Sequence, residues 1–184
     1  IVHTLRSAHY ATELSFENMR VPASNILGEL NKGFAIANDR LTKQRIPYAA
    51  GCIGVAIKAQ EMALEYVPQR ETFGAPLSSR QSIQWMLVDN EIDIKQSLWI
   101  TLEAAAKAER GENFRKEAAM AKLVATEAGG RVVDRCMQMF GGVGLTTDFP
   151  IEKLWRDSRS FMITEGPEEI LKHALQRHVL NQYG

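Results

Sequence analysis

Glu165 is the residue whose type and setting best suit acid–base chemistry. It lies in the stretch MITEGPEEIL, residues 162–171, after several apolar residues. A carboxylate among apolar neighbours is a stronger base than one in water, as proton abstraction near neutral pH requires. The stretch also marks a helix start, with Gly166 as the cap and Pro167 as the first helical residue. Two interpretations of Glu165 are therefore open: an ordinary acid beside a helix start, or a general base.

Arg70 and a glycine-rich segment suit the binding of an anionic ligand. Arg70 in QRETFG precedes a predicted turn, where its planar guanidinium offers two parallel hydrogen bonds to a phosphate. In QMFGGVG, residues 138–144, the glycines let the backbone approach a ligand closely. Ordinary roles stay open, because arginine is favourable near a helix C-terminus and glycine is a common C-cap. Arg45 in RLTKQR is equally consistent with a solvated helix residue.

Long helices must position these segments. Apolar residues recur at spacings of three, four or seven over 34–66, 79–110 and 113–140, and this period predicts amphipathic helices. Shorter helices are predicted over 150–158 and from Pro167 to Gln182. Pro47 should kink or loosen the first helix, and Gly111 should end the second. The fold class predicted is mainly α, an antiparallel four-helix bundle.

The first 21 residues have a different pattern. YATELSFENMRVP places Leu14 and Phe16 among polar neighbours, which predicts one or two short strands. One or two strands do not form a stable sheet alone. We therefore expect this segment either to pair with an element outside the chain or to pack on the helices.

Composition excludes several classes of function. The 184 residues are 45% hydrophobic and 24% charged, typical of one globular domain with its own core. Basic and acidic residues balance at 22 each, so we expect no nucleic-acid partner. No apolar run is long enough for a membrane span, and the start IVHTLRSAHY lacks the features of a signal peptide. Two cysteines and four histidines are too scattered to predict a metal site.

Taken in order, the segments FENMRVPASNILGELNKGF, QRETFG, QMFGGVG and EGPEEI resemble the C-terminal part of the acyl-CoA dehydrogenase family. The intervals from Arg45 to Arg70, Gln138 and Glu165 also match those of the family. The resemblance implies a C-terminal four-helix-bundle domain at 29–184. It implies that residues 1–28 are the end of the family's middle β-domain and a linker. The sequence then looks like a fragment that lacks the family's first half.

The resemblance implies a reaction as well as a fold. Family members bind FAD and oxidise an acyl-CoA thioester to the trans-2-enoyl-CoA. Glu165 would be the base that removes the α-proton, while a hydride passes from the β-carbon to flavin N5. Hydrogen bonds to the thioester oxygen, including one from the Glu165 backbone N–H, would stabilise the enolate charge. The substrate-binding residues implied by the resemblance, besides the base, are Thr42, Arg45, Thr164 and Gly166.

The resemblance also implies a set of flavin contacts. The cofactor-binding residues carried over are Arg70, Thr72, Phe73, Arg80, Gln81, Gln138, Met139, Phe140, Gly141, Gly142, Pro167 and Glu169. Those at 70–73 and 138–142 would meet the FAD of a neighbouring subunit, which implies a homo-oligomer, a dimer or tetramer. Electron-transfer flavoprotein is the implied electron acceptor. The implied location is the cytoplasm of a bacterium or the mitochondrial matrix of a eukaryote.

Some positions depart from the family's pattern. Thr164 stands where tyrosine is common, and a smaller residue is expected to widen the acyl pocket for a bulkier or branched substrate. Pro167 replaces a common threonine, so a hydroxyl contact with the flavin is lost. Glu169 stands where glutamine is frequent near the cofactor. Gln44 occupies the position of an alternative base in some members, which argues against the isovaleryl and long-chain subgroups.

Other functions stay open beside dehydrogenation. An acyl-CoA oxidase would share the base and differ in passing electrons to oxygen. A flavin monooxygenase of the dibenzothiophene type lacks a base at this position, so Glu165 argues against it. A non-catalytic helical module would dimerise without binding flavin and would be colourless.

Overall fold

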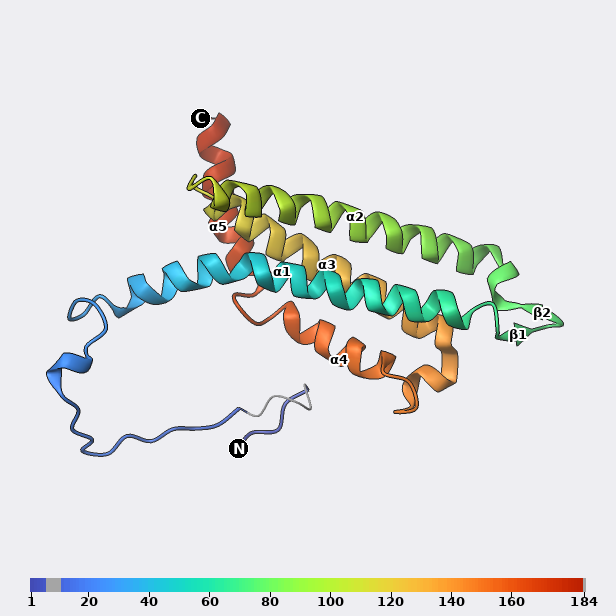
Figure 1. The fold of residues 1–184 in the computed structure, drawn as a ribbon, viewed down its shortest axis with the longest axis horizontal. Coiled ribbons are helices and arrows are strands. Elements are labelled where there is room, and N and C mark those ends of the chain that lie inside the picture. Colours follow the sequence, from blue (N-terminus) through green and yellow to red (C-terminus); the bar gives the residue numbers. More distant parts are fainter. Residues whose placement is uncertain (6–10, 184) are drawn as a thin grey trace.

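The computed structural model describes residues 1–5 and 11–183, and helices dominate this part of the chain (Figure 1). The α-helices are α1 (Gly33–Tyr66), α2 (Gln81–Glu109), α3 (Arg115–Phe140), α4 (Ile151–Phe161) and α5 (Glu168–Tyr183). Short 3-10 helices lie at η1 (Ala23–Asn25), η2 (Leu77–Ser79) and η3 (Gly141–Leu145). The predicted helices are confirmed with small shifts at their ends, and so is the mainly α fold.

Helix α3 is the centre of the bundle. It packs against α1 and α2 along its length and also contacts α4 and α5, as Figure 1 shows. Its small side chains allow close approach: at Gly129, a Cβ would lie 3.4 Å from the carbonyl oxygen of Cys52 in α1. The predicted apolar face of α3 is buried at Ala118, Ala121, Ala125, Ala128, Val132 and Cys136.

Helix α1 continues through Pro47 without interruption. Proline removes one backbone hydrogen bond from a helix, and the neighbouring bonds together with packing on α3 hold the rest. The ribbon of α1 bends in its first half (Figure 1). The first turns of α1 extend beyond the bundle, and Phe34 there is 86% exposed.

The strands predicted within residues 1–21 are not formed in the described part of that segment. Val2 and Ala11 make an isolated antiparallel bridge, and η1 follows further along. This segment runs below the bundle in Figure 1, and Leu14 and Phe16 are 75% and 71% exposed. The strand prediction is wrong for the described residues of this segment, because its backbone makes only the isolated bridge and pairs with no strand of the described chain.

A β-hairpin joins α1 to α2, where the pattern predicts only a helix end and a turn. Strands β1 (Glu71–Thr72) and β2 (Ala75–Pro76) pair antiparallel. Phe73 and Gly74 at the tip both have positive φ, 50° and 73°, the conformation that two-residue hairpins need. The Arg80 guanidinium donates to the carbonyl oxygen of Thr72 and so braces the hairpin.

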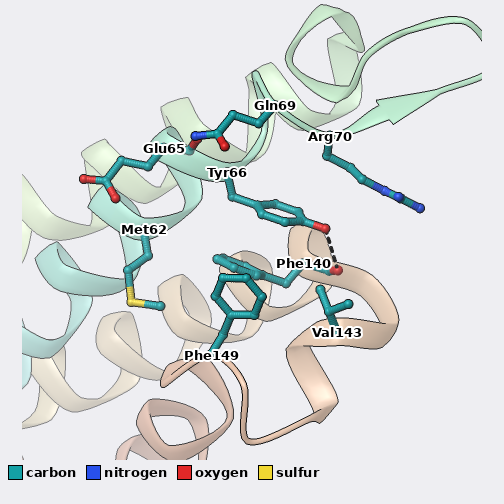
Figure 2. A pocket seen from close by; sticks show the side chains of 8 residues that line it. All are labelled: Met62, Glu65, Tyr66, Gln69, Arg70, Phe140, Val143 and Phe149. Carbon is teal, nitrogen blue, oxygen red and sulfur yellow. Dashed lines mark hydrogen bonds between the residues drawn. The ribbon is translucent and has the colours of Figure 1, made fainter.

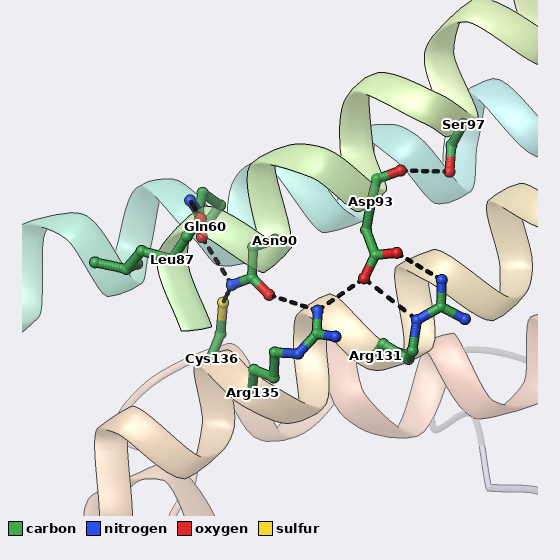
Figure 3. A network of polar contacts seen from close by, with 8 residues as sticks. All are labelled: Gln60, Leu87, Asn90, Asp93, Ser97, Arg131, Arg135 and Cys136. Atoms are coloured by element: carbon green, nitrogen blue, oxygen red, sulfur yellow. Dashed lines mark hydrogen bonds and ion pairs between the residues drawn. The ribbon is translucent and has the colours of Figure 1, made fainter. Parts of the chain in front are cut away.

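A polar network connects α2 to α3 in the interior (Figure 3). The Asp93 carboxylate accepts hydrogen bonds from Arg131 Nη2 at 2.6 Å and Arg135 Nη1 at 2.7 Å. Burial alone would raise the pKa of Asp93, but the hydrogen bonds and charges of the two arginines lower it below its ordinary value. The network therefore keeps Asp93 ionised between the helices.

The same network extends to α1. Asn90 Nδ2 donates to Gln60 Oε1 at 2.8 Å, and Arg135 donates to Asn90 Oδ1 at 3.2 Å. Gln60 in turn donates to the carbonyl oxygen of Leu87 at 3.0 Å. These hydrogen bonds hold α1, α2 and α3 in one register. The register in turn determines where the candidate site residues on these helices lie.

Candidate active site

Glu165 lies in the connection between α4 and α5, in a left-handed backbone conformation with φ of 57°. Such a conformation is uncommon for a residue with a side chain, and it persists only when the surroundings hold it. The turn before it is held by Ser160, whose carbonyl accepts the N–H groups of Ile163 and Thr164, both at 3.1 Å. Gly166 follows with φ of 99°. Glu165 therefore lies in a turn between α4 and α5 and does not continue either helix.

Arg45 of α1 lies next to this connection. Its Nη2 is 3.8 Å from the position that a Cβ on Gly166 would occupy. Burial lowers the pKa of Arg45, and the negative charge of Glu165 partly offsets this effect. Arginine keeps its charge under such conditions. Thr42, one turn earlier, is buried, and its hydroxyl donates to the carbonyl oxygen of Asn38 at 3.0 Å.

Glu165 and Arg45 each have a buried polar atom without a hydrogen-bond partner in the described part of the chain. The atoms are Glu165 Oε2 and Arg45 Nε. A buried polar group without a partner costs about 1–3 kcal/mol. Such atoms in a folded protein indicate a place where a ligand supplies the partners.

Lys122 of α3 is a site residue that the motifs did not indicate. It is 0% exposed, and its Nζ donates to the carbonyl oxygens of Met162 at 3.2 Å and Gly166 at 2.9 Å. Burial lowers the pKa of Lys122. Among the nearby charged groups, Glu165 and Glu168 act to raise this pKa and Arg45 acts to lower it. A signal was available, because Lys122 falls on the apolar face of its helix, between Ala118 and Ala125.

Thr164 has an aromatic neighbour that the sequence did not reveal. The hydroxyl groups of Tyr48 and Thr164 contact each other, and Thr164 also donates to the carbonyl oxygen of Ser160 at 3.2 Å. The Tyr48 ring meets the Phe161 ring edge to face, with centroids 5.5 Å apart. A tyrosine from α1 therefore lies beside Thr164.

A second group of predicted residues meets at the opposite end of α1. The hollow there lies between the end of α1, the hairpin and the end of α3. It gathers seven of the predicted cofactor-binding residues, namely Arg70, Thr72, Gln138, Met139, Phe140, Gly141 and Gly142.

An adjoining hollow of about 520 Å³ has an aromatic wall (Figure 2). Tyr66 stacks on Phe140 with ring centroids 4.3 Å apart, and Phe149 tilts against Phe140 at 5.1 Å. Figure 2 shows Arg70 extending past these rings from the end of α1. Within the described residues, no hydrogen bond or ion pair engages the Arg70 guanidinium, so it is available for an anion.

Gly141 and Gly142, at the end of α3, leave open space beside their backbone. Gly141 caps α3 with φ of 62°, which confirms its expected C-cap position. A Cβ on Gly141 or Gly142 would meet no atom within 4 Å, so the space beside both residues is open. A ligand can therefore contact the backbone of these residues directly.

The remaining predicted cofactor residues lie elsewhere. Phe73 is fully exposed at the hairpin tip, with the Arg80 guanidinium 6.0 Å from its ring centroid. Gln81 is exposed at the start of α2. At the Glu165 end, the Pro167 carbonyl accepts the N–H of Ile170 at 3.1 Å, so α5 begins at Glu168 and not at Pro167.

Glu169 is exposed in the first turn of α5. Residues 1–5 and 11–183 contain no candidate metal centre and no candidate membrane-spanning helix. No group of three or more His, Cys, Asp or Glu side chains gathers to hold a metal ion. No helix there has both the length and the apolar character that a bilayer crossing requires.

Comparison with known families places the chain in one of them. A family model described as the acyl-CoA dehydrogenase C-terminal domain matches residues 31–180. The chain therefore belongs to the acyl-CoA dehydrogenase family, as the ordered motifs indicated, and its bundle corresponds to that domain.

Individual relatives agree with this assignment. The mitochondrial short-chain specific acyl-CoA dehydrogenase of Rattus norvegicus is 37% identical over 96% of this chain and 43% of the relative. The structure of butyryl-CoA dehydrogenase from Megasphaera elsdenii matches with a TM-score of 0.86 and 38% identity, covering 90% of this chain and 43% of that one. A structure described as an electron transferring flavoprotein of Acidaminococcus fermentans matches with a TM-score of 0.86 and 34% identity, over the same shares. The chain thus spans less than half the length of these relatives.

Proposed function

We propose that this chain provides the C-terminal bundle of an FAD-dependent enzyme that oxidises an acyl-CoA to its trans-2-enoyl-CoA, with Glu165 as the base. The observation that carries the proposal is the left-handed Glu165, whose buried Oε2 lacks a partner beside Arg45. A substrate lying against Gly166 would supply partners for these atoms. Residues 29–184 would be the bundle domain, and residues 1–28 the end of a β-domain and a linker.

Glu165 would take the α-proton of the thioester onto its carboxylate. The electron pair of that C–H bond would then form the α,β double bond as the β-hydrogen leaves with its own electron pair. The backbone N–H of Glu165 would donate to the thioester oxygen, where negative charge develops. Arg45, close to Glu165, would lie beside the base and the CoA portion of the substrate. FAD, when bound, would accept the hydride at N5.

The second end of α1 fits the anionic part of FAD. Arg70 offers a guanidinium that no described residue engages, and Gly141 and Gly142 leave open space at their backbone. The stacked Tyr66 and Phe140 rings provide a flat apolar wall beside them. The predicted contact of Phe73 with a neighbouring subunit's flavin, and the predicted flavin contacts of Arg80 and Gln81, remain part of this proposal. The exposed hairpin tip supports a second chain at this end.

Thr164 and Tyr48 would together set the acyl pocket. The sequence suggests that Thr164 widens it, and the contact between the two hydroxyls adds Tyr48 as a second determinant. Replacing Thr164 with Tyr should reduce turnover of branched and long acyl-CoAs more than that of short ones. An equal loss across acyl chains would reject this role.

Partners follow from the same proposal. The enzyme would be a homo-oligomer, a dimer or tetramer, and would pass electrons to electron-transfer flavoprotein. It would work in the cytoplasm of a bacterium or the mitochondrial matrix of a eukaryote. An oxidase would share every residue named here and would differ only in using oxygen.

The direct test is anaerobic addition of acyl-CoAs of graded length to the flavin-loaded enzyme. Bleaching of the flavin absorbance with at least one acyl-CoA is expected, and Glu165→Gln should retain flavin without bleaching. No bleaching with any acyl-CoA would overturn the proposal. Reoxidation by oxygen as fast as by electron-transfer flavoprotein would reassign the enzyme as an oxidase, and a colourless protein would favour a non-catalytic module.

A further inference from the structure

Lys122 is a buried cation that the proposed reaction does not use. Its side chain is 0% exposed in the middle of the bundle. Lysine is almost never fully buried unless it is paired, because desolvating its ammonium is costly. A simple ion pair does not explain it, since in the described part of the chain Lys122 Nζ donates to two carbonyl oxygens of the backbone.

The two acceptors lie on either side of Glu165. Nζ donates to Met162 at 3.2 Å and to Gly166 at 2.9 Å, so one ammonium connects the start and the end of the turn that carries the base. The Met162 carbonyl lies at the C-terminal cap of α4, where helix carbonyls lack intrahelical partners, and the Gly166 carbonyl lies two residues before α5. Lys122 therefore completes the hydrogen bonding of this connection from the rigid α3.

Met162 gives the connection a second fixed point on α3. A Cβ on Gly130 would overlap the terminal methyl of Met162, so this methionine packs directly on the glycine backbone. Gly130 lies about two turns along α3 from Lys122, on the side towards its C-terminus. The turn is thus held by α3 through a side-chain contact and through the Lys122 hydrogen bonds.

Glu165 needs such support because its backbone conformation is unfavourable. A left-handed backbone costs a residue with a side chain about 1–3 kcal/mol, which neighbouring structure must offset. With Met162 and Gly166 both held, the residue between them has little freedom to return to a relaxed conformation.

We propose that Lys122 is a positioning residue that holds the Met162–Gly166 turn and so aims Glu165 at the substrate. This role rests on the proposed function of Glu165 as the base. Lys122 itself touches neither substrate nor flavin in this role, and it acts only through the backbone of the turn.

Hydrogen exchange tests the structural half of the proposal in the full chain. Lys122→Met keeps an unbranched apolar stem and removes the ammonium. The backbone amides of residues 162–168, except Pro167, which has no N–H, should exchange at least fivefold faster in this variant than in the unaltered chain. Lys95→Met, which removes an exposed lysine on α2 paired with Glu91 at 3.8 Å, is the matched control and should leave these amides unchanged. An increase below fivefold in Lys122→Met would overturn the proposal.

Steady-state kinetics of the flavin-loaded enzyme test the functional half. A base displaced by about 1 Å loses up to about a hundredfold in rate. Lys122→Met should therefore lower kcat tenfold or more while KM for the acyl-CoA and the flavin content stay within twofold. A fall in flavin content or a matching rise in KM would indicate general structural damage and overturn the positioning role. Lys122→Gln, judged by the same limits, replaces Lys122→Met if that variant does not fold.

The two proposals can fail separately. If the unaltered enzyme does not bleach with any acyl-CoA, the proposed function fails, and the exchange of residues 162–168 still decides whether Lys122 holds the turn. If Glu165→Gln abolishes bleaching but Lys122→Met changes neither exchange nor kcat, the function stands and the role of Lys122 falls.

Discussion

Asp93 and Glu165 are both carboxylates that lie among helices, but Asp93 is fully hydrogen-bonded to arginines whereas Glu165 has a buried oxygen without a partner in the described chain. Asp93 accepts bonds from Arg131 and Arg135, which α3 places against α2. In the described chain, Glu165 Oε2 and Arg45 Nε are buried with no partner at all. Each region holds a carboxylate near arginine, so composition alone does not distinguish them.

This difference in hydrogen bonding is the one we expect between a polar group that stabilises the fold and one that meets a ligand. A satisfied network such as that of Asp93 stabilises the fold and fixes how helices meet. Unpaired buried atoms such as Glu165 Oε2 cost free energy, and under the proposed function a bound substrate would supply their partners. Variants in the two regions should therefore affect different measurements.

The largest expected effect is that of Glu165→Gln on flavin reduction. Removing a general base costs about a thousandfold in rate, equivalent to about 4 kcal/mol in the barrier. The free energy of unfolding should change by less than about 0.5 kcal/mol, because Oε2 has no bond to lose. Anaerobic stopped-flow absorbance and urea unfolding measure the two effects. Glu61→Gln, an exposed acid on α1, is the control for both.

Asp93→Asn should produce the reverse result. Losing charged hydrogen bonds to two arginines should lower the free energy of unfolding by about 2–3 kcal/mol. Flavin reduction by the folded variant should stay within twofold of the unaltered enzyme. Urea unfolding provides the measurement, with the exposed Glu91→Gln on the same helix as control. A stability loss no greater than that of Glu91→Gln would remove the distinction between the two regions.

The pH dependence of stability should sharpen the same contrast. The pKa of Asp93 is lower in the folded chain than its ordinary value, so its stabilisation is fully present above that ordinary value. It is lost as pH falls through the lower folded pKa. The stability difference between the unaltered chain and Asp93→Asn should therefore be largest near pH 7 and shrink below about pH 4. Urea unfolding at a series of pH values tests this, and a constant difference would contradict it.

The smallest effect on stability is expected from Phe73→Ser. The ring is fully exposed at the hairpin tip, so its loss should change the free energy of unfolding by less than about 0.5 kcal/mol. Under the proposed function the same variant should release flavin more readily on dilution. Flavin fluorescence after gel filtration measures that release. Retention equal to that of the unaltered enzyme would remove Phe73 from the flavin contacts.

Periodicity and glycine placement sufficed to predict the helices, because long amphipathic segments bury their apolar face by themselves. The buried face from Ala118 to Cys136 and the cap at Gly141 followed from local rules. The strands near Leu14 did not follow, because strand formation depends on pairing partners that local pattern does not contain. The hairpin at Phe73 was missed because strands of two residues have no detectable period.

The candidate site could be predicted only in part. Glu165, Arg45 and Arg70 have residue types and intervals that a family resemblance captures. Lys122 and Tyr48 act through contacts made across 40 residues or more, which no local pattern encodes. A lysine on an alanine-rich helix face was nevertheless a visible anomaly in the sequence.

The length of α1 separates the group of residues around Glu165 from the group around Arg70. Arg45 and Tyr66 lie about 21 residues apart on one helix, about 32 Å along its axis. Under the proposed function, the flavin beside Glu165 and the flavin beside Tyr66 would be different molecules, because the flavin met by Arg70 would belong to a neighbouring subunit. A chain impaired at Glu165 and a chain impaired at Arg70 would then form a mixed dimer in which one catalytic centre inherits both defects and the other inherits neither. Under the proposed function, two inactive variants would therefore complement each other in a mixed dimer.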